Sequence, residues 1–252
     1  MTMPPSHSVP PGPVSPMPAA RPLPPLPPLP PPNGRAVLRS PVGLGRAAVA
    51  LLALVIAADL FAVWADWTMY DVSGALAGGD FGDGVQRRAT DADTLVARSG
   101  YAQSAAMVGS VVVFLIWFLR VRVNAEVFNP YGHSKSRTWA GWGWFVPVAN
   151  LWFPRRVTLD IWDASVPAGS RSGNALVNVW WTFWVLVLLA DRASSSAYSK
   201  AGTADEIHDA AAQVMFSDVV DIVAAALAIL VVLKLTRMQH LKALQGPAAY
   251  AV

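Results

Sequence analysis

The sequence predicts an all-α membrane protein: a bundle of four transmembrane helices, a broken segment that is re-entrant or interfacial, and a disordered proline-rich N-terminal arm. Composition is the first observation behind this prediction. Of the 252 residues, 54% are hydrophobic and only 14% are charged, and the mean hydropathy is +0.40. Soluble domains carry about 25% charged residues. The second observation is that the apolar residues are grouped in blocks long enough to cross a bilayer.

Cysteine, histidine and net charge exclude several kinds of site. The chain has no cysteine, which removes thiolate ligands and disulfides. Its histidines, His7, His133, His208 and His240, are scattered without the spacing of metal ligands, so we expect no metal site and no cofactor. The net charge of +3 is divided between two membrane sides rather than collected on one face. We therefore expect no nucleic-acid partner.

Residues 1–34 are predicted to form a disordered arm, because a segment so rich in proline cannot build a core and favours the extended polyproline II helix. Leu23, Leu26 and Leu29 are three residues apart between prolines, which places them on one edge of such a helix. The arm is either a ligand for a cytoplasmic protein with an aromatic groove or a stiff spacer. A basic juxtamembrane linker, residues 35–46, follows it.

The helical membrane domain is predicted to cover residues 47–244, followed by a tail at residues 245–252. It contains four apolar blocks that are long enough to span the hydrocarbon core. These blocks are residues 47–67, 103–119, 174–190 and 214–233. The polar segments between the first and second blocks (71–101) and between the third and fourth (191–213) are predicted to be loops, the former with a helical stretch at 90–104.

Between the second and third spans, residues 139–154 hold four tryptophans and two prolines in an apolar segment too short to cross a bilayer. Pro147 removes a backbone donor, so a helix here must kink or break. We predict a broken helix that dips into the membrane and returns, or a kinked segment on the surface. Asn150 follows three residues later and can hydrogen-bond the freed backbone groups. The residues of this motif are Trp142, Trp144, Pro147, Asn150 and Pro154.

Two further patterns flank the start of the third span. Residues 155–165 can form an amphipathic helix, with apolar residues on one face and acidic residues on another. We expect this helix to lie at the membrane surface or to pack under the bundle. Within the span, Trp180, Trp181 and Trp184 fall within about one helical turn, so at least two share a face. This tryptophan stripe is either ordinary packing or a platform for a ligand.

Four carboxylates interrupt the first and fourth spans. At 1.5 Å per residue, Asp59 lies about 18 Å from the inner face, and Asp221 lies about 10 Å below the outer face. Asp66 and Asp218 lie further toward the outer boundary. Buried ionisable residues usually mark a functional site, so these four are our candidate intramembrane polar site, either protonated or neutralised by a cation. The alternative is that they bond only to tryptophan N–H groups, backbone or Arg98. We expect the first and fourth helices to be neighbours.

Four spans and one segment that does not cross place both termini on one side of the membrane. Fourteen of the nineteen lysines and arginines fall on that side. Positive residues favour the cytoplasmic face, so we predict a multi-pass protein of the cell membrane with both termini in the cytoplasm and the lipid bilayer as its first partner.

Two runs of residues carry a family resemblance. The first comprises Trp142, Trp144-Phe145-Val146-Pro147, Asn150-Leu151 and Pro154, followed by Ile161-Trp162, and the second is Leu235-Thr236-Arg237-Met238-Gln239. Together they resemble an actinobacterial membrane family known only as domain of unknown function 4328. In that family a W-F-V-P-x-x-N-L-x-x-P core lies between the second and third membrane helices. The resemblance covers roughly residues 47–244. It implies the architecture and, because the family has no assigned activity, no catalytic residue.

The sequence leaves two classes of function open. The first is a membrane scaffold or interaction module that presents the proline-rich arm in the cytoplasm. The alternative is an ion or small-solute binding or transport protein that uses the intramembrane aspartates. With only four spans, transport would call for a homo-oligomer. We expect no enzyme, since the spans contain no serine-hydrolase, zinc-protease or phosphate-loop motif.

Overall fold

The computed structural model describes residues 36–246. The arm, with Leu23, Leu26 and Leu29, lies outside this range, as do residues 247–252. Within the described range the chain forms six α-helices and one short 3₁₀ helix, and no strand. The predicted all-α class is confirmed.

Four long helices contain the four predicted spans. They are α1 (Val42–Ala77), α2 (Asp83–Phe128), α5 (Ala175–Lys200) and α6 (Ala204–Leu244). All four are long and apolar enough to cross a membrane. Helix α1 begins inside the predicted basic linker, and α6 ends one residue before the predicted tail. The protein is therefore a multi-pass membrane protein.

The helices are longer than the bilayer requires, and the two predicted polar loops are wrong. Residues 78–82 alone separate α1 from α2, and residues 201–203 alone separate α5 from α6. At 1.5 Å per residue, α2 is about 69 Å long, against a hydrocarbon core of about 30 Å. The polar segments are helical because one apolar residue per turn packs inward. Met69, Val72, Val85, Ala92 and Ala211 form a separate small core at this end.

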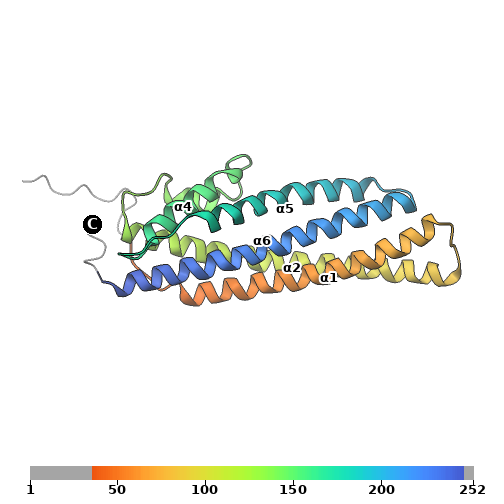
Figure 1. Ribbon diagram of the computed structural model, residues 1–252, viewed down its shortest axis with the longest axis horizontal. Helices are drawn as coiled ribbons and strands as arrows, with labels where there is room; N and C mark the ends of the chain where they lie inside the picture. Colours follow the sequence, from red (N-terminus) through yellow and green to blue (C-terminus); the bar gives the residue numbers. More distant parts are fainter. Residues whose placement is uncertain (1–35, 247–252) are drawn as a thin grey trace, which may run out of the picture. The chain divides into compact units, whose positions relative to one another are not determined.

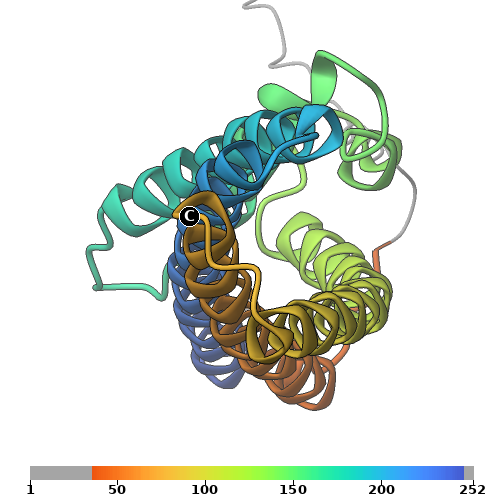
Figure 2. The same ribbon diagram turned by 90° about the vertical axis from the view of Figure 1, so that its right-hand side faces the viewer.

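The long helices follow one another in the spatial order α2, α1, α6, α5. Helix α1 packs along both α2 and α6, and α5 packs along α6, so the first and fourth spans are neighbours. Seen from one end, the four helices form an arc whose two extremes are α2 and α5 (Figure 2). The short connections 78–82 and 201–203 lie at one end of the bundle, and the described chain ends lie at the other (Figure 1).

At the end with the chain termini, three short elements lie between α2 and α5. They are α3 (Arg137–Trp142), the 3₁₀ helix η1 (Ala149–Leu151) and α4 (Phe153–Ser165). Helix α4 is the predicted amphipathic helix, and it packs under the bundle against α2, α5 and α6. Its Ile161 and Trp162 are fully buried. Its Asp160 is also buried and accepts hydrogen bonds from the backbone and hydroxyl of Ser134.

The segment 139–154 is a broken helix, as expected, although the break precedes Pro147. Helix α3 already ends at Trp142, and Val148 has a positive φ of 68°, which few residues other than glycine adopt. Pro154 lies in the first turn of α4, where a missing N–H costs nothing. The predicted bond from Asn150 is not formed: its side-chain oxygen is buried without a partner among the described residues.

Residues 235–239 of α6 form hydrogen bonds to the neighbouring helices. The indole Nε1 of Trp117 donates to Thr236 Oγ1 over 3.0 Å. Gln239 is fully buried, accepts from Asn124 Nδ2 over 2.9 Å and donates to Ser165 Oγ over 3.0 Å. Buried polar side chains that are hydrogen-bonded in this way hold α2, α4 and α6 in register.

Candidate functional site

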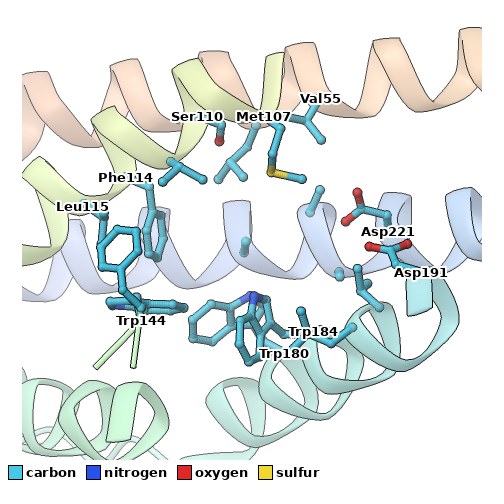
Figure 3. A pocket seen from close by; sticks show the side chains of 18 residues that line it. Val55, Met107, Ser110, Phe114, Leu115, Trp144, Trp180, Trp184, Asp191 and Asp221 are labelled. Carbon is cyan, nitrogen blue, oxygen red and sulfur yellow. The ribbon is translucent and has the colours of Figure 1, made fainter. Parts of the chain in front are cut away.

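A cavity of about 310 Å³ lies inside the arc of helices, bordered by α1, α2, α5, α6 and the broken segment (Figure 3). Its volume is at the small end of the usual range for ligand pockets. Its walls are apolar and aromatic, except for the hydroxyl of Ser110 and the carboxyl groups of Asp191 and Asp221. The cavity therefore has the composition of a small-molecule site with a few polar groups.

Helical periodicity explains which side chains reach the cavity. On α5, Trp180, Trp184 and Asp191 are four and seven residues apart, so they share one face. On α6 the lining residues Asp221, Ala224 and Ala228 are spaced by three and four residues. Because alanine has only a methyl side chain, the α6 wall leaves the space that the cavity occupies.

Trp144 closes the end of the cavity that is nearer to the described chain ends. This motif residue reaches from the broken segment into the interval between α2 and α5. Its ring centroid is 5.6 Å from Phe114 and from Phe118 on α2, and 5.7 Å from Trp184 on α5, all with edge-to-face geometry. The tryptophan stripe of α5 thus packs around Trp144, while Trp180 and Trp184 also line the cavity.

Two carboxyl groups form the opposite end of the cavity. Figure 3 shows Asp191 of α5 and Asp221 of α6 close to one another, away from the tryptophans. Ser217 donates a 2.5 Å hydrogen bond to Asp191. Within residues 36–246, Asp221 has no hydrogen bond or ion pair, and the cavity lining includes no lysine, arginine or histidine. This end of the cavity is therefore negatively charged whenever both groups are ionised.

A second acidic group lies beside the cavity, around Gln103 of α2. The amide Nε2 of Gln103 donates to Asp59 Oδ1 over 3.1 Å and to Asp218 Oδ1 over 2.9 Å. Asp59 and Asp218 are only 2% and 8% exposed. The other oxygen of each carboxyl, Oδ2, is buried and has no hydrogen-bond partner in the described chain.

Asp66 completes this group, because its buried carboxyl contacts that of Asp218. We call Asp59, Asp66, Asp218 and Gln103 the carboxyl cluster. Burial and like charge both oppose ionisation of adjacent carboxyl groups. Two such groups form a hydrogen bond with each other only when one of them carries a proton.

The structure thus brings together three of the four predicted aspartates and places the fourth, Asp221, one helical turn away at the cavity. From the sequence all four form one candidate site, whereas in the structure Gln103 joins Asp59 to Asp218, and no hydrogen bond joins Asp59 to Asp221 in the described chain. None of the donors considered from the sequence, a tryptophan N–H, the backbone or Arg98, bonds to Asp59 in the described chain.

Sequence reasoning missed two residues of the site, Gln103 and Asp191. Gln103 begins the second apolar block, and Asp191 directly follows the third. The signal for Asp191 was its position seven residues, or two turns, after Trp184, on the face of the tryptophan stripe. Among the described residues, no three histidine, aspartate or glutamate side chains are arranged to hold a metal ion.

A polar layer lies at the other end of the bundle, outside the apolar blocks. Arg122 forms a buried 2.9 Å ion pair with Glu126, which also pairs with Arg137. Burial lowers the pKa of the nearby His133 imidazole below its ordinary value, and the positive charge of Arg122 lowers it further. The ion pairs of Glu126 with Arg122 and Arg137 hold α2 against α3 and its connector, which indicates a structural role for this layer.

Comparison with known proteins adds one finding. The family model described as "Domain of unknown function (DUF4328)" matches residues 83–237. The match runs from the start of α2 to residue 237 in α6 and includes the broken segment, Gln103, Asp191, Asp218 and Asp221, while α1 with Asp59 and Asp66 precedes it. No curated protein and no solved structure matches the chain significantly.

Proposed function

The chain belongs to the DUF4328 family, and we propose that this multi-pass membrane protein handles ions, taking up a proton at the carboxyl cluster of Asp59, Asp66 and Asp218. The observation that carries this proposal is the pair of buried carboxyl oxygens, Oδ2 of Asp59 and of Asp218, that have no donor in the described chain. An uncompensated buried charge costs several kcal/mol. A bound proton removes that cost.

The contact between Asp66 and Asp218 supports a proton as the ion. A metal cation needs several oxygen ligands directed at one point, whereas a proton needs only one donor and one acceptor. The amide of Gln103 donates to Oδ1 of Asp59 and to Oδ1 of Asp218, which separates these two oxygens from the contact between Asp66 and Asp218. These features favour a proton as the charge that the cluster exchanges.

Depth in the membrane also supports an ion-handling role. Counted at 1.5 Å per residue from Lys234, which ends the apolar part of α6, Asp218 lies about 24 Å above the inner face. The cluster is then in the outer half of a hydrocarbon core of about 30 Å. We propose that this half faces outward and that both termini are in the cytoplasm of a cell whose surface membrane holds the protein, because the basic residues gather at the other end.

The pH dependence of thermal stability tests this function. If the folded protein retains a proton that the unfolded chain releases, raising the pH favours unfolding. We expect the thermal midpoint of the purified full-length protein in detergent to fall as the pH rises above about 4, the ordinary pKa of aspartate in an unfolded chain. Asp59→Asn and Asp218→Asn, which cannot ionise, should flatten this dependence.

Asp209→Asn is the matched control, because Asp209 lies on the same helix as Asp218 but is exposed. It should follow the parent. The proposal fails if both cluster variants keep the parent's slope. If sodium or potassium stabilised the parent but not the variants at high pH, the ion bound at the cluster would be a metal cation rather than a proton.

We also propose, from the sequence alone, that the arm binds a cytoplasmic protein through Leu23, Leu26 and Leu29, which would make the bundle a scaffold. The arm lies outside the described residues. Deletion of residues 1–34 should leave the pH dependence unchanged and remove binding to isolated polyproline-recognising domains. Replacement of the three leucines by alanine in the intact arm should remove the same binding, and binding that persists contradicts the scaffold role.

A further inference from the structure

The two ends of the cavity differ in chemical character, and the carboxyl cluster does not account for this difference. One end is formed by the tryptophan rings of Trp144, Trp180 and Trp184, and the other by the carboxyl groups of Asp191 and Asp221 (Figure 3). The walls between these ends are mainly apolar. A ligand that satisfies both ends must combine an apolar body with a positive charge.

We propose that this cavity binds a hydrophobic organic cation, whose charged group lies against Asp191 and Asp221 and whose apolar body packs against Trp180 and Trp184. The inference goes beyond the proposed function, since it concerns residues outside the carboxyl cluster and a ligand much larger than a proton.

Charge complementarity is the first argument. Asp191 accepts one hydrogen bond, from Ser217, and Asp221 has no hydrogen bond or ion pair in the described chain. The lining contains no basic residue that could neutralise them. A carboxylate in such surroundings gains from an organic cation close by, because attraction between charges strengthens as water is excluded. Tryptophan faces add a cation–π contribution wherever the charge approaches them.

Other occupants satisfy only one end of the cavity. A small inorganic cation would exchange its water shell for walls that offer few oxygen ligands. A lipid acyl chain would fill the apolar end, leave the half-buried Asp221 with no polar partner in the described chain and leave Asp191 without a counter-charge. Only a ligand with both an apolar body and a positive charge avoids both penalties.

The position of the cavity gives such a ligand a route from the bilayer. Its rim on α2 includes Met107 and Val111, which are 41% and 40% exposed and lie in the apolar block. Helices α2 and α5 are the two extremes of the arc (Figure 2), and we infer from the exposed rim residues that the cavity opens between these helices toward the lipid. Hydrophobic cations accumulate in membranes, and this lateral opening lets them enter without crossing water.

The experiment uses the full-length protein in phosphatidylcholine nanodiscs and the probe tetraphenylphosphonium, with binding measured by equilibrium dialysis against protein-free nanodiscs. Tetraphenylborate has the same shape and the opposite charge, so it separates charge recognition from apolar partitioning. We expect saturable binding of the cation and none of the anion. Asp221→Asn should weaken cation binding by about tenfold or more, since a partner charge is lost in a low-dielectric site.

Asp191→Asn should weaken binding to a similar extent, and Asp209→Asn, remote from the cavity and exposed, should bind like the parent. Replacing Asp221 disturbs no bond of the described chain, so we expect a folded variant, verified by an unchanged thermal midpoint. Equal binding of both probes, equal binding by parent and aspartate variants, or no binding above empty nanodiscs would each overturn the proposal.

The result is separable from the test of the proton site. If the pH dependence proves independent of Asp59 and Asp218 while cation binding still requires Asp221, only the proposed function fails. If the pH dependence is confirmed and tetraphenylphosphonium does not bind, the cavity inference alone fails.

Discussion

The side-chain amide of Gln103 lies 2.9 Å from Asp218 Oδ1 and donates a hydrogen bond that joins α2 to α6 across the bundle. The same nitrogen donates to Asp59 on α1. One neutral side chain therefore connects three membrane-spanning helices that carry buried acidic groups. Apart from Asp66, which contacts Asp218, Gln103 is the only side chain of the described chain that bonds to either carboxyl.

The first prediction concerns this amide. Gln103→Leu removes the donor to two buried acceptors, and such a loss costs about 1–3 kcal/mol for each group left unsatisfied. We expect a lower thermal midpoint in detergent. Gln86→Leu is the control, because Gln86 is on the same helix and exposed, and its side chain has no hydrogen bond in the described chain. Equal midpoints for the two variants would contradict the bridging role.

The second prediction concerns Trp144, whose ring is packed between Phe114 on α2 and Trp184 on α5. Trp144→Ala should destabilise the protein by about 3–5 kcal/mol, the usual cost of deleting a large aromatic side chain from a packed site. Trp144→Phe keeps an aromatic ring and removes a buried indole N–H that has no hydrogen-bond partner within residues 36–246, so we expect a smaller loss. Thermal unfolding in detergent measures both.

Trp142→Ala is the matched control for this series. Trp142 belongs to the same tryptophan-rich motif but is 64% exposed, so its removal should change the midpoint little. If Trp142→Ala destabilises the protein as much as Trp144→Ala, the closing role assigned to Trp144 is wrong.

The sequence predicted the helices that cross the membrane and failed at their ends. A lipid-facing helix needs apolar residues on all sides, and this produces blocks that composition alone detects. Beyond the bilayer a helix needs only one apolar residue per turn, as with Val72, Val85 and Ala92. Among many aspartates and glycines this weaker signal was read as a loop.

Some residues of the candidate site could likewise be predicted from the sequence and others could not. Buried aspartates within an apolar block are conspicuous, so Asp59 and Asp218 were found from the sequence. Gln103 and Asp191 lie at the limits of their blocks, where polar residues are ordinary. Their roles depend on the rotation and depth of α2 and α5 relative to α6, and the cavity depends on the fold of the broken segment that carries Trp144. These are tertiary properties that periodicity does not determine.

The third prediction concerns the contact between α1 and α6 at Gly45. A Cβ atom at this position would lie 2.7 Å from Thr236 Oγ1, the acceptor for the Trp117 indole. Alanine normally stabilises a helix by roughly 1 kcal/mol relative to glycine. We expect Gly45→Ala to destabilise instead, because Thr236 must move and its hydrogen bond is disturbed. The measurement is again the thermal midpoint in detergent.

Gly43→Ala provides the control for that substitution. Gly43 is in the first turns of the same helix, and a Cβ atom there would meet no atom within 4 Å. It should be neutral or stabilising. A Gly45→Ala variant that is as stable as Gly43→Ala would show that α1 and α6 do not approach this closely.

The last prediction tests the orientation in the membrane. Because the chain has no cysteine, single cysteines report sidedness without background. Ser136 precedes α3 at the end of the bundle with the described chain ends, and Ser195 lies on the last turns of α5 at the opposite end. Both are exposed, and neither side chain has a hydrogen bond in the described chain, so Ser136→Cys and Ser195→Cys should fold normally.

The basic residues gather at the end that holds Ser136, and positive residues favour the cytoplasm. In intact cells, an impermeant thiol reagent should therefore label Ser195→Cys, and should reach Ser136→Cys only after permeabilisation. The opposite pattern would reverse the orientation and place the carboxyl cluster in the cytoplasmic half of the membrane.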